Sequence, residues 1–111
     1  MENTEVIMNL IINAGSAKSS AMEAIYAAKK RDFDAVAEKF KLANEQINKA
    51  HNAQTSLISA EANGEHTEIN LMMIHAQDHL MTSIAFIDLA KELVDFYKLA
   101  LKQGKDAHGN E

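Results

Sequence analysis

Apolar residues recur every three or four positions along almost the whole chain, which is the period of an amphipathic α-helix. Three stretches carry this pattern, and short polar segments separate them. The pattern predicts helices over residues 4–30, 33–62 and 67–103. No stretch shows the alternation of a strand, and no internal repeat is visible.

The residues between these stretches supply the expected helix ends. Asp32 has a side-chain oxygen that can cap the second helix, and Gly64 can adopt the left-handed conformation that ends it. Thr67 is the expected cap of the third helix, and Gly104 its expected end. The polar tail, residues 104–111, is expected to be disordered.

Short connections force neighbouring helices to run antiparallel, so residues 1–111 are predicted to form one all-α domain, an up-down-up three-helix bundle. The third helix is apolar on more than one face and requires burial on two sides. A monomer cannot supply that burial, so we expect a homo-oligomer with the third helix at its centre. The apolar residues off its core stripe are Leu71, Ile74, Met81, Ala85, Phe86, Leu89 and Leu93.

The composition argues against several classes of function. The chain has 111 residues and no cysteine, which excludes disulfides and thiol catalysis within it. A net charge of −5 argues against a nucleic-acid partner, whose phosphates require a basic surface. No apolar run approaches the roughly 20 residues that span a bilayer, and the N-terminus lacks the basic start of a secretory signal. We therefore expect a cytoplasmic protein without membrane insertion.

One polar cluster interrupts the apolar third helix. His75, Asp78 and His79 are three and four residues apart, so all three lie on one helix face. One interpretation is a hydrogen-bonded patch that fixes helix register or oligomeric state. A second is a metal site, for which His51 of the second helix is a candidate further ligand.

The third interpretation is phosphoryl transfer. A neutral imidazole can attack phosphorus and form a labile N–P bond, and a second imidazole one turn away can hold the phosphoryl oxygens. His75 and His79 fit these two roles, and Gln77 and Thr82 lie close enough in sequence to add hydrogen-bond donors. The spacing alone does not decide between the three interpretations.

Three segments carry a resemblance to a known family, in order and at consistent separations. They are Ile-Ile-Asn-Ala-Gly-Ser-Ala-Lys-Ser at 11–19, Ala-His-Asn-Ala-Gln-Thr-Ser-Leu at 50–57 and His-Ala-Gln-Asp-His-Leu-Met-Thr at 75–82. With them the chain resembles the enzyme IIA component of the lactose/cellobiose (diacetylchitobiose) family of the bacterial sugar phosphotransferase system. The third segment is highly specific for this family.

The resemblance implies a homotrimer of three-helix bundles, nine helices in all, that carries phosphate during uptake of a β-linked disaccharide. His75 matches the family's phosphorylated histidine, and His79 matches a second histidine that supports the phosphoryl group. The donor would be the phosphohistidine of HPr. The acceptor would be a cysteine of the cognate IIB component, which works with the membrane permease IIC.

The resemblance also implies a metal. Asp78 matches an aspartate that lines the threefold axis and binds a divalent cation such as Mg²⁺, and a cation would relieve repulsion between three carboxylates. Gln77 then either donates a hydrogen bond to the phosphoryl group or supports a residue that does. His51 and Gln54 satisfy polar groups within the bundle. Gly15 permits close helix packing near the site.

Two alternatives belong to other functional classes. A structural or adaptor bundle would use the polar cluster to fix its oligomeric register. A signalling histidine-phosphotransfer domain is also a helical bundle with one exposed histidine, but it does not require a second histidine or a trimer axis. His66 and His108 are expected to be ordinary solvent-facing residues.

Overall fold

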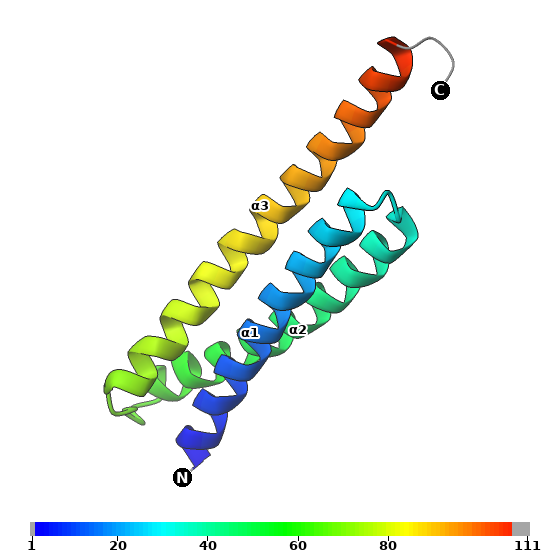
Figure 1. The fold of residues 1–111 in the computed structure, drawn as a ribbon. Helices are drawn as coiled ribbons and strands as arrows, with labels where there is room; N and C mark the ends of the chain where they lie inside the picture. Colours follow the sequence, from blue (N-terminus) through cyan, green and yellow to red (C-terminus); the bar gives the residue numbers. More distant parts are fainter. Residues whose placement is uncertain (1, 108–111) are drawn as a thin grey trace.

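The computed structural model describes the backbone of residues 2–107 and the side chains of residues 4–103. It consists of three α-helices, α1 (Glu2–Lys29), α2 (Phe33–Ala62) and α3 (Leu71–Ala107). The helices run up, down and up, so α1 and α3 are parallel to one another and antiparallel to α2 (Figure 1). The predicted all-α three-helix fold is confirmed.

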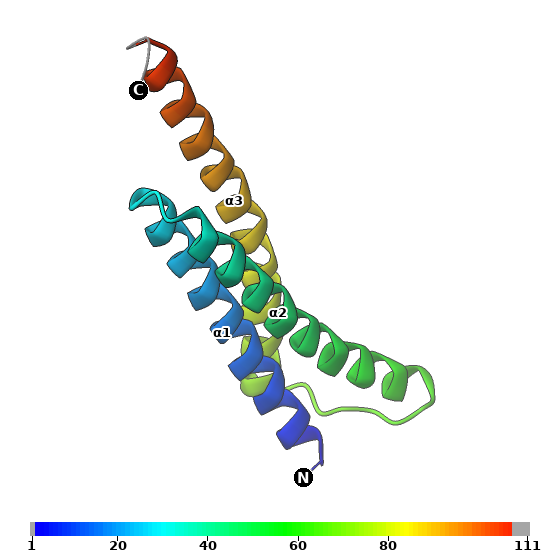
Figure 2. The same ribbon diagram turned by 90° about the vertical axis from the view of Figure 1, so that its right-hand side faces the viewer.

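The bundle is long, thin and open on one side. It measures 65 × 21 × 17 Å, and its radius of gyration is 18.1 Å, well above the roughly 13 Å of a compact domain this size. α1 packs against both other helices, whereas α2 and α3 touch each other little. The C-terminal half of α2 diverges from α1 and α3 (Figure 2), and α3 projects beyond the end of α1 (Figure 1).

The core is built from small residues on α1 and larger ones on the helices that face it. Because five alanines of α1 are almost fully buried, its backbone lies close to its neighbours. Leu10 and Leu80 are fully buried in the lower half of the core, and Val94 is nearly so in the upper half. The five alanines are Ala14, Ala17, Ala21, Ala24 and Ala28.

Both ends of the α1–α2 and α2–α3 connections are capped by local hydrogen bonds. Arg31 has a φ of 63°, and the N–H groups of Arg31 and Asp32 donate to carbonyls of the last turn of α1. The Asp32 carboxylate then accepts from the Ala35 N–H at 3.2 Å, as predicted for the cap of α2. Gly64, with a φ of +88°, ends α2 as predicted.

The predicted bounds of the third helix were wrong at both ends. Thr67 does not cap α3; Asn70 does, with its Oδ1 accepting from the Met73 N–H at 2.9 Å. The end of α2 lies away from α3, so the connection between Ala62 and Leu71 must cross that gap before α3 begins (Figure 2). Gly104 does not end α3 either, since the helix continues to Ala107; residues 108–111 of the predicted disordered tail lie outside the described residues.

One face of α3 stays uncovered by the rest of the chain. Its exposed apolar side chains include Leu71 at 81%, Leu89 at 68% and Phe96 at 65% of their surface. The positions recur at helical spacing on the face opposite the core. Among the described residues nothing packs over this face, which we call the outer stripe of α3. It comprises Leu71, Ile74, Met81, Leu89, Phe96 and Leu99.

None of the helices within residues 2–107 is both long enough and apolar enough to cross a membrane.

Candidate functional site

The second and third turns of α3 place two imidazoles side by side. The ring centroids of His75 and His79 are 5.3 Å apart, and the ring planes are inclined at 52°. His75 is exposed, whereas His79 is half-buried against α1. The structure therefore brings the two predicted histidines together, one accessible to a partner and the other behind it.

A glycine on α1 makes the room that His79 occupies. A Cβ atom at Gly15 would lie 3.5 Å from Nε2 and 3.6 Å from Cε1 of the His79 ring. These are van der Waals distances, so the ring lies directly against the backbone of α1. Any longer side chain at position 15 would extend into the space of the imidazole. The predicted role of Gly15 in close packing near the site agrees with this geometry.

Asp78 lies on the outer stripe rather than against the core. Its carboxylate is exposed between Ile74 and Met81, one turn to either side, and it forms no ion pair with the side chains of residues 4–103. The described residues contain no group of three histidine, cysteine, aspartate or glutamate side chains able to hold a metal. Asp78 by itself offers one carboxylate, which is fewer oxygen ligands than Mg²⁺ requires.

Gln77 faces away from the two histidines. Its Oε1 accepts a hydrogen bond from Gln54 Nε2 at 2.7 Å, and its Nε2 contacts Met73 Sδ at 3.8 Å. Gln77 is two residues from His75, or about 200° around the helix, so the two side chains leave α3 in opposite directions. The structure therefore brings Gln77 together with α2 and not with the imidazoles.

The remaining polar residues from the sequence analysis have local partners or none near the site. Thr82 donates to the Asp78 carbonyl at 2.9 Å, within its own helix. The prediction that His51 and Gln54 both satisfy groups within the bundle is correct for Gln54 only, because His51 is exposed on α2. His66 is exposed as expected, and His108 lies outside the described residues.

Sequence reasoning missed one residue of α1 that lines the same hollow as His79, namely Lys18. The Nζ of Lys18 lies 5.6 Å from the centroid of the Phe86 ring, on the side of α1 that faces α3. Nothing in the periodicity of the chain predicts this contact, because it depends on the register between two helices. The only available signal was the position of Lys18, one turn after Gly15.

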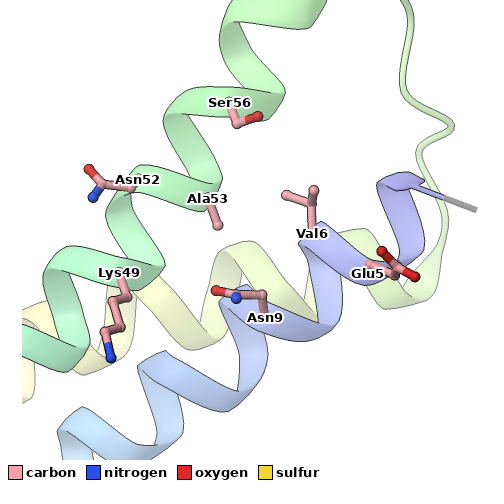
Figure 3. Close-up of a pocket in the computed structure, with 7 residues that line it drawn as sticks. All are labelled: Glu5, Val6, Asn9, Lys49, Asn52, Ala53 and Ser56. Carbon is pink, nitrogen blue, oxygen red and sulfur yellow. The ribbon is translucent and has the colours of Figure 1, made fainter.

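A hollow of about 510 Å³ opens where α1 and α2 begin to separate (Figure 3). Figure 3 shows Val6 of α1 and Ala53 of α2 on opposite sides of it, with polar side chains around them. No histidine lines it, and it is separate from the His75–His79 pair. Its lining residues are Glu5, Val6, Asn9, Lys49, Asn52, Ala53 and Ser56.

Two shifted pKa values belong to ion pairs away from the histidines. His66 hydrogen-bonds the Glu61 carboxylate at 2.5 Å and lowers the pKa of that carboxyl. Glu23 hydrogen-bonds the ammonium of Lys39 at 2.7 Å and raises the pKa of that group. Both pairs are exposed on the surface, where such interactions contribute little to stability.

Comparison with known proteins gives consistent matches over most of the chain. Residues 5–98 match the family model described as the lactose/cellobiose-specific IIA subunit of the PTS system. The lichenan-specific phosphotransferase enzyme IIA component of Bacillus subtilis is 44% identical over 102 residues, which is 92% of this chain and 93% of that protein. The N,N′-diacetylchitobiose-specific EIIA component of Escherichia coli K12 is 40% identical over 97 residues, 87% of this chain and 84% of that protein.

Solved structures agree in fold. The crystal structure of the cellobiose-specific enzyme IIA of Bacillus anthracis superposes with a TM-score of 0.89 at 44% identity, covering 92% of this chain and 94% of that one. The IIA(chitobiose) chain in the solution structure of its complex with HPr, from Escherichia coli, gives a TM-score of 0.78 at 38% identity. That match covers 90% of this chain and 97% of the other.

Proposed function

The chain belongs to the lactose/cellobiose-specific IIA family of the phosphotransferase system, and we propose that His75 is the histidine that carries its phosphoryl group. Members of this family are phosphotransferase components that act through a phosphohistidine. Family membership therefore replaces the adaptor bundle and the signalling histidine-phosphotransfer domain as interpretations of the polar cluster. The open question is which imidazole receives the group, and how.

The observation that carries this assignment is the pairing of an exposed with a half-buried imidazole. A carrier must be approached by a donor protein and later by an acceptor protein, so the reacting nitrogen must be accessible. His75 is exposed, while His79 lies against α1 at Gly15. We assign His75 as the nucleophile and His79 as its support. His66 is held by Glu61 and does not share this arrangement.

The donor we propose is phospho-HPr, supported by the complex that the Escherichia coli relative forms with HPr. A lone pair of the neutral His75 imidazole attacks phosphorus, and the N–P bond of the donor breaks with its electrons returning to the donor imidazole. The reaction exchanges one N–P bond for another. The protein therefore contributes position and charge stabilisation. We assign this support to His79, whose ring centroid is 5.3 Å from that of His75.

The acceptor we propose is a cysteine of the cognate IIB component. IIB acts with the membrane permease IIC in the uptake of a β-linked disaccharide, and this chain meets IIB in the cytoplasm. Relatives of this chain are named for lichenan, lactose, cellobiose and N,N′-diacetylchitobiose. Because IIA meets proteins rather than sugar, the chain leaves open a cellobiose, diacetylchitobiose or lactose type of substrate. We assign Gln77 a supporting role in holding α3 against α2, since its side chain accepts a hydrogen bond from Gln54.

We further propose a homotrimer with the outer stripe of α3 at its centre. The stripe exposes large apolar side chains, among them Leu71 at 81% and Phe96 at 65%, on one long helix, and burying them against copies of the same helix would stabilise the assembly. Asp78 lies within this stripe. Three copies of it would repel one another, and a divalent cation such as Mg²⁺, held by the three Asp78 carboxylates, would neutralise that charge.

Intact-mass spectrometry after incubation with phosphoenolpyruvate, enzyme I and HPr tests the assignment of His75. The wild-type chain should gain about one phosphoryl group, labile in acid, and His75→Ala should gain none, because no other imidazole among residues 4–103 has this placement. His51→Ala is the matched control, since it removes another exposed histidine, from α2. Phosphate on the His75→Ala chain would reject the assignment.

Sedimentation tests the axial cation. With Mg²⁺ present the wild type should sediment as a trimer, and a chelator should weaken the assembly because the three carboxylates then repel one another. Asp78→Asn removes that repulsion, so its assembly should no longer respond to the chelator. If the wild-type assembly is indifferent to chelator and identical to that of Asp78→Asn, no cation is held at Asp78.

A further inference from the structure

The last turn of α2 is closed by a Schellman motif, in which two N–H groups beyond the helix turn back onto its final carbonyls. Asn63 is the C-cap residue, and the Gly64 N–H donates to the Glu61 carbonyl at 3.1 Å. The Glu65 N–H donates to the Ala60 carbonyl at 2.9 Å. Gly64 has a φ of +88°, which a residue with a Cβ adopts only at a cost. The end of α2 therefore depends on the peptide that joins Asn63 to Gly64.

These two residues also form the one Asn-Gly pair of the sequence. The nitrogen of the residue after an asparagine can attack the carboxamide carbon, and glycine leaves that nitrogen unshielded because it has no Cβ. Asn63 is exposed, and the end of α2 on which it lies stands away from α1 and α3 (Figure 2). A homotrimer with α3 at its centre would leave this end at its periphery. Among residues 4–103, larger residues follow the other asparagines, which are Asn9, Asn13, Asn44, Asn48, Asn52 and Asn70.

We propose that Asn63 is a site of covalent modification in the native protein, where deamidation produces aspartate and isoaspartate. The Gly64 nitrogen gives its proton to a base of the solvent and bonds to the Asn63 carboxamide carbon. The carboxamide nitrogen takes up a proton and leaves as ammonia, so a succinimide ring remains. Water then opens this ring at either carbonyl, which breaks one C–N bond, restores the N–H and leaves a carboxylate. Water is the one co-reactant, so the modification needs no enzyme.

The Schellman motif controls the rate of this reaction. The Gly64 N–H is held by the Glu61 carbonyl, and Asn63 has a ψ of 9°, which turns the Gly64 nitrogen away from the Asn63 side chain. Attack therefore requires the motif to open and the peptide after Asn63 to rotate. Helix ends fray, and their exposed backbone hydrogen bonds open at a smaller free-energy cost than unfolding of the domain. Deamidation at Asn63 thus proceeds from a locally opened end of α2, more slowly than in an unfolded chain.

The products differ from asparagine at the points on which the motif depends. Both add a carboxylate at the C-terminus of α2, where the helix dipole disfavours negative charge and where Glu61 and Glu65 already lie. Isoaspartate also directs the main chain through the former side chain and lengthens it by one carbon. The Gly64 and Glu65 N–H groups then no longer match the carbonyls that they cap. The modification therefore loosens the end of α2.

Peptide mapping by mass spectrometry tests the proposal on the full chain, held at neutral and at alkaline pH, both folded and in urea. The map separates asparagine, aspartate and isoaspartate at position 63 from those at other positions. Asn70 is the internal control, because it is exposed and lies outside α2 and α3, as Asn63 does, but precedes Leu71. Gly64→Ala shields the attacking nitrogen with a Cβ, and it is compared with the wild type in urea, where neither chain has a helix cap. Gly15→Ala is the matched control, since it leaves the Asn-Gly pair unchanged.

In the folded wild type, aspartate and isoaspartate should accumulate at position 63 before any other asparagine of residues 4–103 changes, and faster at alkaline pH. Unfolding in urea should raise the rate by about tenfold, because the motif no longer has to open. Gly64→Ala should lower the rate in urea by about tenfold, and Gly15→Ala should match the wild type. An unmodified Asn63 in the folded protein would overturn the proposal, as would equal rates at Asn70, or a wild-type rate in urea for Gly64→Ala. Phosphoryl transfer does not enter these measurements, so they are independent of the assignment of His75.

Discussion

Substitution of Gly15 should separate helix stability from the function of His79. A glycine in the middle of a helix is less stable than alanine by about 0.5–1 kcal/mol, because its backbone loses more freedom on folding. The Cβ of Gly15→Ala would meet the His79 ring at 3.5 and 3.6 Å, which is ordinary contact. Gly15→Ala should therefore stabilise the protein by about 0.5–1 kcal/mol and leave the imidazole where it is.

A longer side chain at the same position should have the opposite effect on function. Each further carbon of Gly15→Leu adds about 1.5 Å beyond the Cβ, so the side chain and the His79 ring would compete for the same space. The ring would be pushed from its place behind His75, and phosphoryl acceptance should fall, by at least about tenfold if His79 supports the group as proposed. The helix itself should persist, since leucine is a good helix former.

Urea unfolding followed by circular dichroism gives the free energy of unfolding, at one fixed protomer concentration because assembly contributes to stability. Phospho-HPr gives the rate of acceptance. Matched substitutions at Met8, which is exposed on α1 two turns before Gly15, control for effects on the helix alone. Destabilisation by Gly15→Ala would contradict the expected ordinary contact between a Cβ and the His79 ring. An unchanged rate in Gly15→Leu would refute the idea that Gly15 makes room for the imidazole.

Two further predictions concern the core and the surface. Leu80→Ala empties a fully buried position and should lower the free energy of unfolding by about 2–5 kcal/mol in urea melts, whereas Ile58→Ala, 60% exposed on α2, should change it little. Because His66 lowers the pKa of Glu61, the stabilisation from this pair is present above the ordinary carboxyl pKa of 4.5 and is lost as pH falls through the lowered value. His66→Ala should bring the Glu61 pKa back up in an NMR titration, and an unmoved pKa would contradict the pairing.

Local signals identified the ends of α2 correctly because those ends are determined locally. Asp32 accepts from an N–H three residues ahead, and Gly64 adopts the left-handed conformation that few other residues tolerate. The start of α3 is determined differently. Thr67 and Asn70 are both capping types, and the choice depends on how far the chain must travel from the displaced end of α2, which periodicity does not encode.

The site also contains contacts that are determined within one helix and contacts that depend on how the helices pack. The pairing of His75 with His79 follows from spacing on one helix, so the sequence was sufficient for it. The contact between Gln54 and Gln77 depends on how α2 lies against α3, and the contact between Lys18 and Phe86 depends on how α1 does. Such contacts between helices require the three-dimensional register, and reasoning along the chain did not find them.

The register of α3 explains why so much of the function lies on this helix. Leu80 points into the core, Asp78 lies on the uncovered outer stripe, and His75 and His79 lie between them along α1. Each residue advances about 100° around the axis, so two adjacent turns place a core side chain, an exposed carboxylate and an exposed imidazole in fixed directions. Because one rigid helix holds all three, a partner that contacts the imidazole also meets the edge of the outer stripe. In the proposed carrier, docking at His75 and assembly through the outer stripe therefore use neighbouring surfaces of α3.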